Sequence, residues 1–149
     1  MLKKIIKFTL VICCMLIIFI FSNDSGVASS KKSDKVIIDL VGVVSHKKVS
    51  DKDRDKYIEK YVFIIRKCAH FTIYLILGIL VISLLSEYRV VNFKTVLYTL
   101  LIVFLYACSD ELHQLFIIGR SSEIRDVLID SSGGFIGSYI YYLFRRKSK

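Results

Sequence analysis

Several signatures of well-known protein classes are missing from this 149-residue sequence. It has no aromatic RNA-binding signature and no zinc-finger spacing, so nucleic acid is not an expected partner. It lacks the His-Glu-x-x-His and Gly-x-Ser-x-Gly motifs that position a metal-bound water or a nucleophilic serine. Proline is absent, and there is no internal repeat. A small chain without a repeat leaves little room for a transport pathway unless it oligomerises, so a transporter is disfavoured.

Cysteine is scarce, and its spacing does not indicate a metal centre. All of the cysteines lie within or at the edge of apolar runs: Cys13, Cys14, Cys68 and Cys108. None has the spacing of a zinc site. Cysteine packs well as a small apolar side chain, so we expect these residues to serve packing. The sequence therefore predicts no resident metal and no cofactor.

Apolar residues, by contrast, are abundant. They make up 54% of the sequence, and the mean hydropathy is +0.56, which is typical of an integral membrane protein. A membrane-spanning helix needs about 20 mostly apolar residues. Four segments approach this length with few charges: residues 5–21, 64–85, 92–109 and 127–144. We therefore expect an all-α integral membrane protein in which residues 1–149 form a single domain with four transmembrane helices.

The positive charges predict the side of the membrane on which each connection lies. The formal net charge is +9, with basic clusters before the first segment, between the second and third, and after the fourth. Basic residues close to a span favour the cytoplasmic side, so the N- and C-termini are predicted to be cytoplasmic. Residues 22–63 then form an extracytoplasmic loop, although this loop also contains many Lys and Arg residues. An alternative is that the first segment is a signal peptide, cleaved near Gly26-Val27-Ala28.

Two parts of this loop have a distinctive composition. KVIIDLVGVVS (35–45) is apolar but too short to cross the membrane, and it is compatible with an amphipathic helix in the interface. SHKKVSDKDRDKYIEKY (45–61) is dense in charges of both signs, and it predicts a solvated helix or loop.

Polar residues gather where three of the predicted spans reach the outer side. An up, down and up path brings together the start of the second span, the end of the third and the start of the fourth. Asp126 and Asp130 are one helical turn apart, so they share a face and repel each other. A membrane helix tolerates this only if a basic residue, a metal or a shared proton compensates. The candidate basic partners are Arg66, Lys67, Arg120 and Arg125.

Small residues follow these acids at spacings of four. Gly133 pairs with Gly137 in this pattern, and Gly134 pairs with Ser138. The spacing lets the backbone of a neighbouring helix approach closely. We expect the stripe to serve helix packing and to hold the acidic face of the fourth segment against its neighbours.

Several motifs occur together in one order along the chain. They are RKCAHF at 66–71, followed by Tyr74 and Gly78, SDELHQ at 109–114, GRS at 119–121, and RDVLID at 125–130. In these motifs, and in FSNDSG after the first segment, the sequence resembles the VanZ-like family over nearly its whole length. The resemblance implies a small bacterial integral membrane protein in the cytoplasmic membrane. The family's namesake is associated with low-level resistance to the glycopeptide antibiotic teicoplanin, and the resemblance carries over no catalytic residue.

The first functional hypothesis is binding at the membrane surface, surrounded by membrane lipid. The polar cluster would recognise a lipid-linked cell-wall precursor or a lipoglycopeptide, with Arg forming paired hydrogen bonds to phosphate or carboxylate. Apolar walls would hold an acyl chain, and a homo-oligomer is compatible with the sequence. The predicted ligand-binding residues are Arg66, Lys67, His70, Tyr74, Glu111, His113, Gln114, Arg120, Ser121, Asp126 and Asp130.

The alternative is a membrane-embedded enzyme that acts on an envelope lipid or cell-wall precursor. A histidine would act as general base, and a carboxylate would orient it or act as acid. The candidate catalytic residues are His70, Asp110, Glu111, His113, Asp126 and Asp130. Within this alternative, a metal site would draw on His70, His113, Asp110 and Glu111. A third interpretation is structural, with the polar residues only tying the helix ends together.

Overall fold

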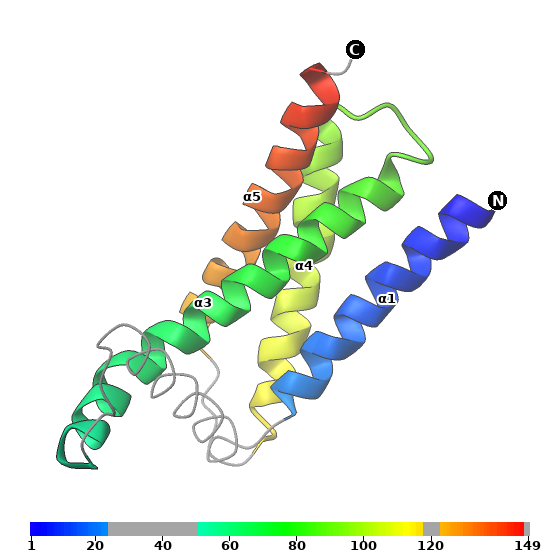
Figure 1. The fold of residues 1–149 in the computed structure, drawn as a ribbon. Coiled ribbons are helices and arrows are strands. Elements are labelled where there is room, and N and C mark those ends of the chain that lie inside the picture. The colour runs from blue at the N-terminus through cyan, green and yellow to red at the C-terminus, as the bar shows by residue number, and fades with distance from the viewer. Residues whose placement is uncertain (24–50, 118–122, 148–149) are drawn as a thin grey trace.

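The computed structural model describes residues 1–23, 51–117 and 123–147 of the chain. These residues form the helices labelled in Figure 1, with the following bounds: α1 Leu2–Ser22, α3 Asp51–Leu85, α4 Phe93–Gln114 and α5 Ile124–Lys147. The described ranges contain no strand, so the predicted all-α class is confirmed. The predicted interfacial helix at 35–45 and the candidate site residues Arg120 and Ser121 lie outside the described residues.

Three of these helices are long and apolar enough to cross a membrane. They are α1, the Ile64–Leu85 part of α3, and α4. α5 has 24 residues, but Asp130 and a run of serines and glycines make it less apolar than the other three. The fourth transmembrane segment therefore stays a prediction, although α5 packs against both α3 and α4.

α3 begins well before its apolar part. Of the two alternatives predicted for the charged segment 45–61, the structure has helix from Asp51 onward. Arg66, Lys67 and His70 consequently lie inside a continuous helix, close to the start of its apolar part. Helical backbone on both sides fixes the positions of these three residues, whereas the terminal residues of a helix tend to fray.

The helices run alternately in opposite directions along the bundle. Figure 1 shows the start of α1, the end of α5 and the connection between α3 and α4 at one end of the molecule. The end of α1, the end of α4 and the start of α5 lie at the opposite end. The start of α1 and the end of α5 therefore lie at the same end of the bundle. That this end faces the cytoplasm stays a prediction from the charges.

A reciprocal cap defines the start of α4. The side chain of Asn92 accepts a hydrogen bond of 3.0 Å from the backbone N–H of Thr95. The Thr95 hydroxyl in turn accepts a hydrogen bond of 3.3 Å from the backbone N–H of Asn92. These bonds satisfy backbone donors that the first helical turn leaves without partners. They fix the point at which the chain turns back into the bundle after α3.

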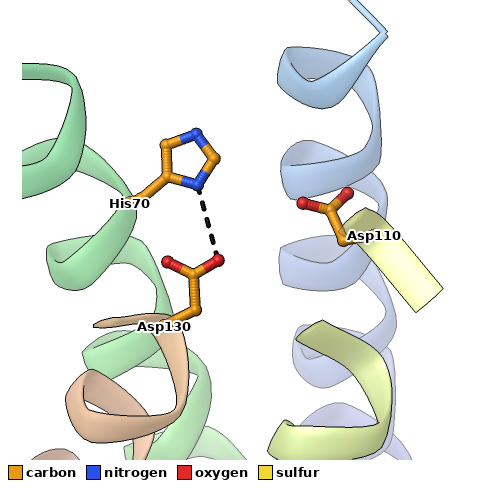
Figure 2. Close-up of side chains that lie close together, drawn as sticks. All are labelled: His70, Asp110 and Asp130. Atoms are coloured by element: carbon orange, nitrogen blue, oxygen red, sulfur yellow. Dashed lines mark ion pairs between the residues drawn. The ribbon is translucent and has the colours of Figure 1, made fainter. Parts of the chain in front are cut away.

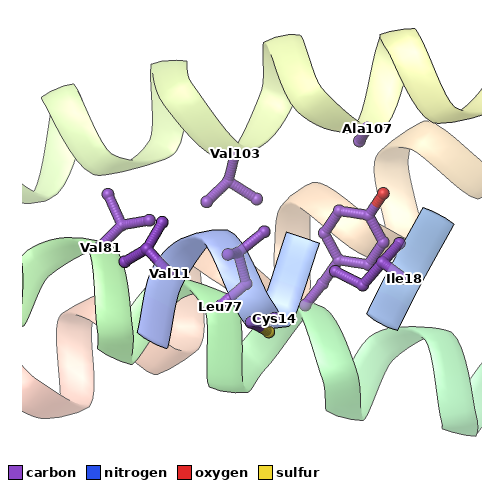
Figure 3. Close-up of a cluster of buried hydrophobic side chains, with 8 residues drawn as sticks. Val11, Cys14, Ile18, Leu77, Val81, Val103 and Ala107 are labelled. Carbon is purple, nitrogen blue, oxygen red and sulfur yellow. The ribbon is translucent and has the colours of Figure 1, made fainter. Parts of the chain in front are cut away.

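The apolar core lies between α1, α3 and α4. Its buried side chains face one another across the three helices, and Figure 3 labels Val11, Cys14, Ile18, Leu77, Val81, Val103 and Ala107. The hydroxyl of Tyr106 in α4 donates a hydrogen bond of 2.6 Å to the backbone oxygen of Met15 in α1. α1 is therefore held to the bundle by both apolar packing and a specific polar contact.

The outside of the bundle is also apolar. Large side chains point outward along α1 and α4, and Phe8, Leu16, Leu101 and Leu105 are each between 54% and 58% exposed. Soluble monomers rarely expose continuous apolar surfaces of this kind, whereas lipid tails solvate them well. The described helices thus have the surface of a multi-pass membrane protein.

α3 and α5 approach so closely that glycine is required where they touch. A β-carbon on Gly78 of α3 would overlap the backbone oxygen of Gly134 in α5. A β-carbon on Gly137 of α5 would overlap the backbone oxygen of Leu75 in α3. The small-residue stripe therefore packs backbone against backbone, as its spacing predicts.

An ion pair joins α1 to the turn that follows α3. Lys7 Nζ lies 2.5 Å from a carboxylate oxygen of Glu87 and donates another hydrogen bond, of 3.0 Å, to the backbone oxygen of Ser83. The hydrogen bond from Lys7 lowers the pKa of Glu87 from its ordinary value, although desolvation acts in the opposite direction. The contact sets the position of α1 along the bundle at the end that holds the termini.

Gly78→Ala is expected to destabilise the bundle. The added methyl group must push the backbones of α3 and α5 apart, and overpacking of this kind costs about 1–3 kcal/mol. Thermal unfolding of the purified protein in detergent would show a lower melting temperature. Ser132→Ala is the matched control, because Ser132 lies on the exposed side of α5. Equal melting temperatures for the two variants would contradict the close contact.

Candidate functional site

Three side chains from three helices meet toward the end of the bundle opposite the termini. His70 of α3, Asp110 of α4 and Asp130 of α5 each offer one nitrogen or oxygen atom, and these atoms all lie within 4.8 Å of one another. Figure 2 shows the Asp110 carboxylate facing the His70–Asp130 pair. The three residues come from three separate sequence motifs, so the fold itself assembles this His–Asp–Asp cluster.

Both acids of the cluster are buried. Asp130 is 0% exposed and Asp110 is 3% exposed, whereas the side chain of His70 is 26% exposed. An oxygen of Asp130 lies 3.5 Å from Nδ1 of His70, and neither Asp130 oxygen accepts a hydrogen bond from a described residue. Desolvating carboxylates in this way is costly unless a nearby charge compensates.

A hydrogen bond within α4 orients the other acid. Nε2 of Gln114 donates a hydrogen bond of 3.1 Å to Oδ2 of Asp110, one helical turn earlier. Oδ1 of Asp110 accepts no hydrogen bond from the described part of the chain. Asp110 thus has one oxygen held in place and the other available to a further group.

An ion pair between α3 and α5 lies one turn away from the cluster. Lys67 pairs with Asp126, and their side chains are 19% and 16% exposed. Among the basic candidates that the structure describes, Lys67 is therefore the one paired with Asp126. Asp130 faces a histidine instead, so the two acids of α5 have different partners.

Glu111 is placed at the start of α5. Its Oε2 accepts a hydrogen bond of 3.0 Å from the backbone N–H of Glu123, which immediately precedes Ile124, the first residue of α5. A carboxylate is favoured there, because the first N–H groups of a helix have no partners within the helix and carry partial positive charge. Glu111, at 3% exposure, thus connects the end of α4 with the start of α5.

His113 and Tyr74 lie in different surroundings. The ring of His113 stacks on Phe19 of α1 with the ring centres 4.6 Å apart. Tyr74 is fully buried one turn after His70, and its hydroxyl has no hydrogen-bond partner among the described residues. That hydroxyl is close enough to Asp110 and Asp130 to interact with their charges. Tyr74 therefore belongs beside the His–Asp–Asp cluster, whereas His113 belongs to the contact with α1.

The remaining basic candidates are less engaged. Arg125 pairs with Glu123 at 2.9 Å, and its side chain is 75% exposed. Arg66 is half-buried and forms no ion pair with another described residue. Its place beside Lys67 in α3 leaves it as the described basic residue best placed to meet an external anion.

The structure groups the metal-type residues differently from the sequence analysis. The metal set expected from the sequence combines His70 and Asp110 with His113 and Glu111, whereas the structure combines them with Asp130. The sequence contains a signal for the role of Asp130, because this residue is the one acid deep inside the apolar and small-residue segment 127–144.

The fold and the site define a multi-pass helical membrane protein with a buried polar cluster toward one end of its bundle. The chain belongs to the VanZ-like family, because the family model described as VanZ/LLP1 matches residues 7–145. The match covers α3, α4, most of α1, nearly all of α5 and every residue of the cluster. Comparisons with curated proteins and with solved structures found no match.

Asp130→Asn and Asp126→Asn are expected to affect stability in opposite ways. At pH 8, where most histidine is neutral, Asp130 is a buried charge without a hydrogen bond from the described residues, so the amide should leave the melting temperature unchanged or raise it. Asp126→Asn removes the ion pair with Lys67 and should cost about 1–3 kcal/mol. Thermal unfolding in metal-free buffer measures both. An equal loss in the two variants would show that Asp130 is a structural tie.

Proposed function

We propose that this VanZ-like protein binds the polar head of a lipid-linked, anionic molecule at the outer face of the bacterial cytoplasmic membrane. The supporting observation is the burial of Asp110, Gln114 and Asp130, each 3% exposed or less, in a bundle with an apolar exterior. Ionisable residues inside a membrane protein are costly and are commonly retained for function. A purely structural tie would leave fewer of the Asp110 and Asp130 oxygens without a hydrogen bond from the described residues.

The chemistry around the cluster supports a head group that carries both negative charge and hydrogen-bond donors. Arg66, one helical turn before His70 on the same face of α3, brings positive charge close to the cluster, and a guanidinium binds phosphate through paired hydrogen bonds. The carboxylates of Asp110 and Asp130 accept hydrogen bonds from hydroxyl or amide groups. A lipid-linked cell-wall precursor combines these features with an acyl tail that suits the apolar outer surface of the helices.

This binding also supports a contribution to teicoplanin resistance. Teicoplanin is a lipoglycopeptide that reaches its target at the membrane surface, where the target is anchored by lipid. A protein that holds the same precursor, or the drug's own acyl chain, reduces the access of the drug to its target. The effect should be larger for a glycopeptide with an acyl chain than for one without.

Arg66→Ala is expected to weaken precursor binding at least fivefold. The experiment measures binding of a fluorescent lipid-linked cell-wall precursor to the purified chain in lipid nanodiscs. Arg146→Ala is the control, because Arg146 is an exposed arginine of α5 at the opposite end of the bundle. In a susceptible bacterial host, the wild-type chain should raise the inhibitory concentration of teicoplanin, and Arg66→Ala should not. Equal binding by Arg66→Ala and wild type, or an equal loss with Arg146→Ala, would contradict the proposal.

A second candidate function is supported by the geometry of His70. A buried carboxylate at Nδ1 of a histidine is the arrangement that orients an imidazole as general base, leaving Nε2 for the substrate. In this case the precursor would be converted as well as bound. Mass spectrometry of precursor recovered from wild-type and His70→Gln nanodiscs separates the two functions, because an unchanged mass with the wild type excludes catalysis on that substrate.

A further inference from the structure

We propose that His70, Asp110 and Asp130 bind a divalent transition-metal ion, with Zn²⁺ and Mn²⁺ as the ions of suitable chemistry. Each residue offers one atom of a type that binds such ions: an imidazole nitrogen or a carboxylate oxygen. The site would lie between α3, α4 and α5, so the ion would add a link among helices that the Lys67–Asp126 ion pair and the Glu123–Glu111 hydrogen bond also join.

The distance between His70 and Asp130 supports shared coordination. The 3.5 Å between Nδ1 and Oδ2 is not a hydrogen bond in this structure. Two ligands of one tetrahedral Zn²⁺, at bond lengths of about 2.0–2.2 Å, are separated by about 3.3–3.5 Å. The observed spacing therefore fits coordination of one ion by both side chains. Asp110 completes the set within 4.8 Å, and a side-chain movement of about 1 Å brings it to bonding distance.

The unsatisfied oxygens point to a missing positive charge. Both oxygens of Asp130 and Oδ1 of Asp110 are buried without a hydrogen bond from the described residues. Figure 2 shows these carboxylates directed toward the space beside the His70 ring. A protonated histidine compensates only one carboxylate, whereas a divalent ion with neutral histidine compensates both. The resulting neutral cluster removes most of the cost of burying the acids.

The surroundings of the cluster resemble those of a built metal site. Protein carboxylates that bind metals are themselves held by hydrogen bonds, and the bond from Gln114 to Asp110 Oδ2 has this role while leaving Oδ1 directed inward. Tyr74 lies one helical turn after His70 on the same face of α3, and its buried hydroxyl has no hydrogen-bond partner among the described residues. Three protein ligands leave a coordination position open, which is the pattern of metal sites that bind a further molecule.

The mixed ligand set favours transition metals over the hard cations. Mg²⁺ and Ca²⁺ prefer sites made entirely of oxygen, whereas imidazole with carboxylates suits Zn²⁺, Mn²⁺ and similar ions. Metal binding through Nδ1 also excludes His70 as a general base, because the remaining nitrogen then carries its proton. The metal site shares Asp110 and Asp130 with the proposed precursor site. A titration with the metal alone tests the metal site without the precursor, so failure of one proposal can be distinguished from failure of the other.

The test is metal binding by the full chain, purified in detergent, stripped with a chelator and titrated with Zn²⁺ or Mn²⁺ alone. We expect one equivalent of Zn²⁺ or Mn²⁺ to bind, and His70→Gln, Asp110→Asn and Asp130→Asn each to weaken binding at least tenfold. The ion should also raise the melting temperature of the wild type and leave that of Asp130→Asn unchanged, because only a bound ion stabilises the fold. Gel filtration confirms that each variant is folded before titration.

His113→Gln is the matched control. It removes a histidine near the same end of α4 that stacks on Phe19 and lies outside the His–Asp–Asp cluster. Its affinity should equal that of the wild type. The proposal is overturned if the wild type binds neither ion, if His113→Gln loses binding as strongly as His70→Gln, or if Mg²⁺ or Ca²⁺ binds more tightly than both transition metals.

Discussion

The contact of backbone on backbone between α3 and α5 is the constraint that the polar site depends on. His70 lies two helical turns before Gly78 in α3, and Asp130 lies one turn before Gly134 in α5. Because a β-carbon at Gly78 would overlap Gly134, the two helix axes cannot move apart or slide without losing this fit. The distance between the histidine and the acid is thus set by residues that have no side chain. A longer side chain at the contact would change the site without touching any of its polar groups.

Charge balance then explains which acids stabilise the fold and which remain available to bind another group. Asp126 is matched by Lys67, and Glu111 is matched by the positive start of α5. Asp110 and Asp130 have less support, although Asp110 is as deeply buried as Glu111 and Asp130 is fully buried. The protein therefore separates its acids into two groups within a few turns of helix. The contacts of Asp126 and Glu111 hold the helices together. The buried oxygens of Asp110 and Asp130 are available to a cation or a hydrogen-bond donor.

The sequence predicted the helical class, the apolar segments and the close packing of the small-residue stripe, because each follows from a short local pattern. Hydropathy located α1, α4 and the apolar part of α3, and the four-residue spacing of glycines predicted the contact with α5. The partners of individual side chains were harder to predict. Spacing showed that Asp126 and Asp130 share a face, but only the rotation of α3 decides that Lys67 meets the first and His70 the second. His113 and His70 looked equivalent in the sequence, and the stacking on Phe19 distinguishes them because it depends on where α1 packs.

The ion pair between Lys7 and Glu87 has a consequence for how the protein is made. Lys7 lies inside the first apolar segment, and its partner is 80 residues further along the chain. At a synthesis rate of about 5–20 residues per second, Glu87 leaves the ribosome about 4–16 seconds after Lys7. During that interval the lysine must stay in contact with water or lipid head groups, since a charged residue is costly in the hydrocarbon interior. The ion pair between Lys7 and Glu87 therefore forms only after α3 has been made and has packed beside α1.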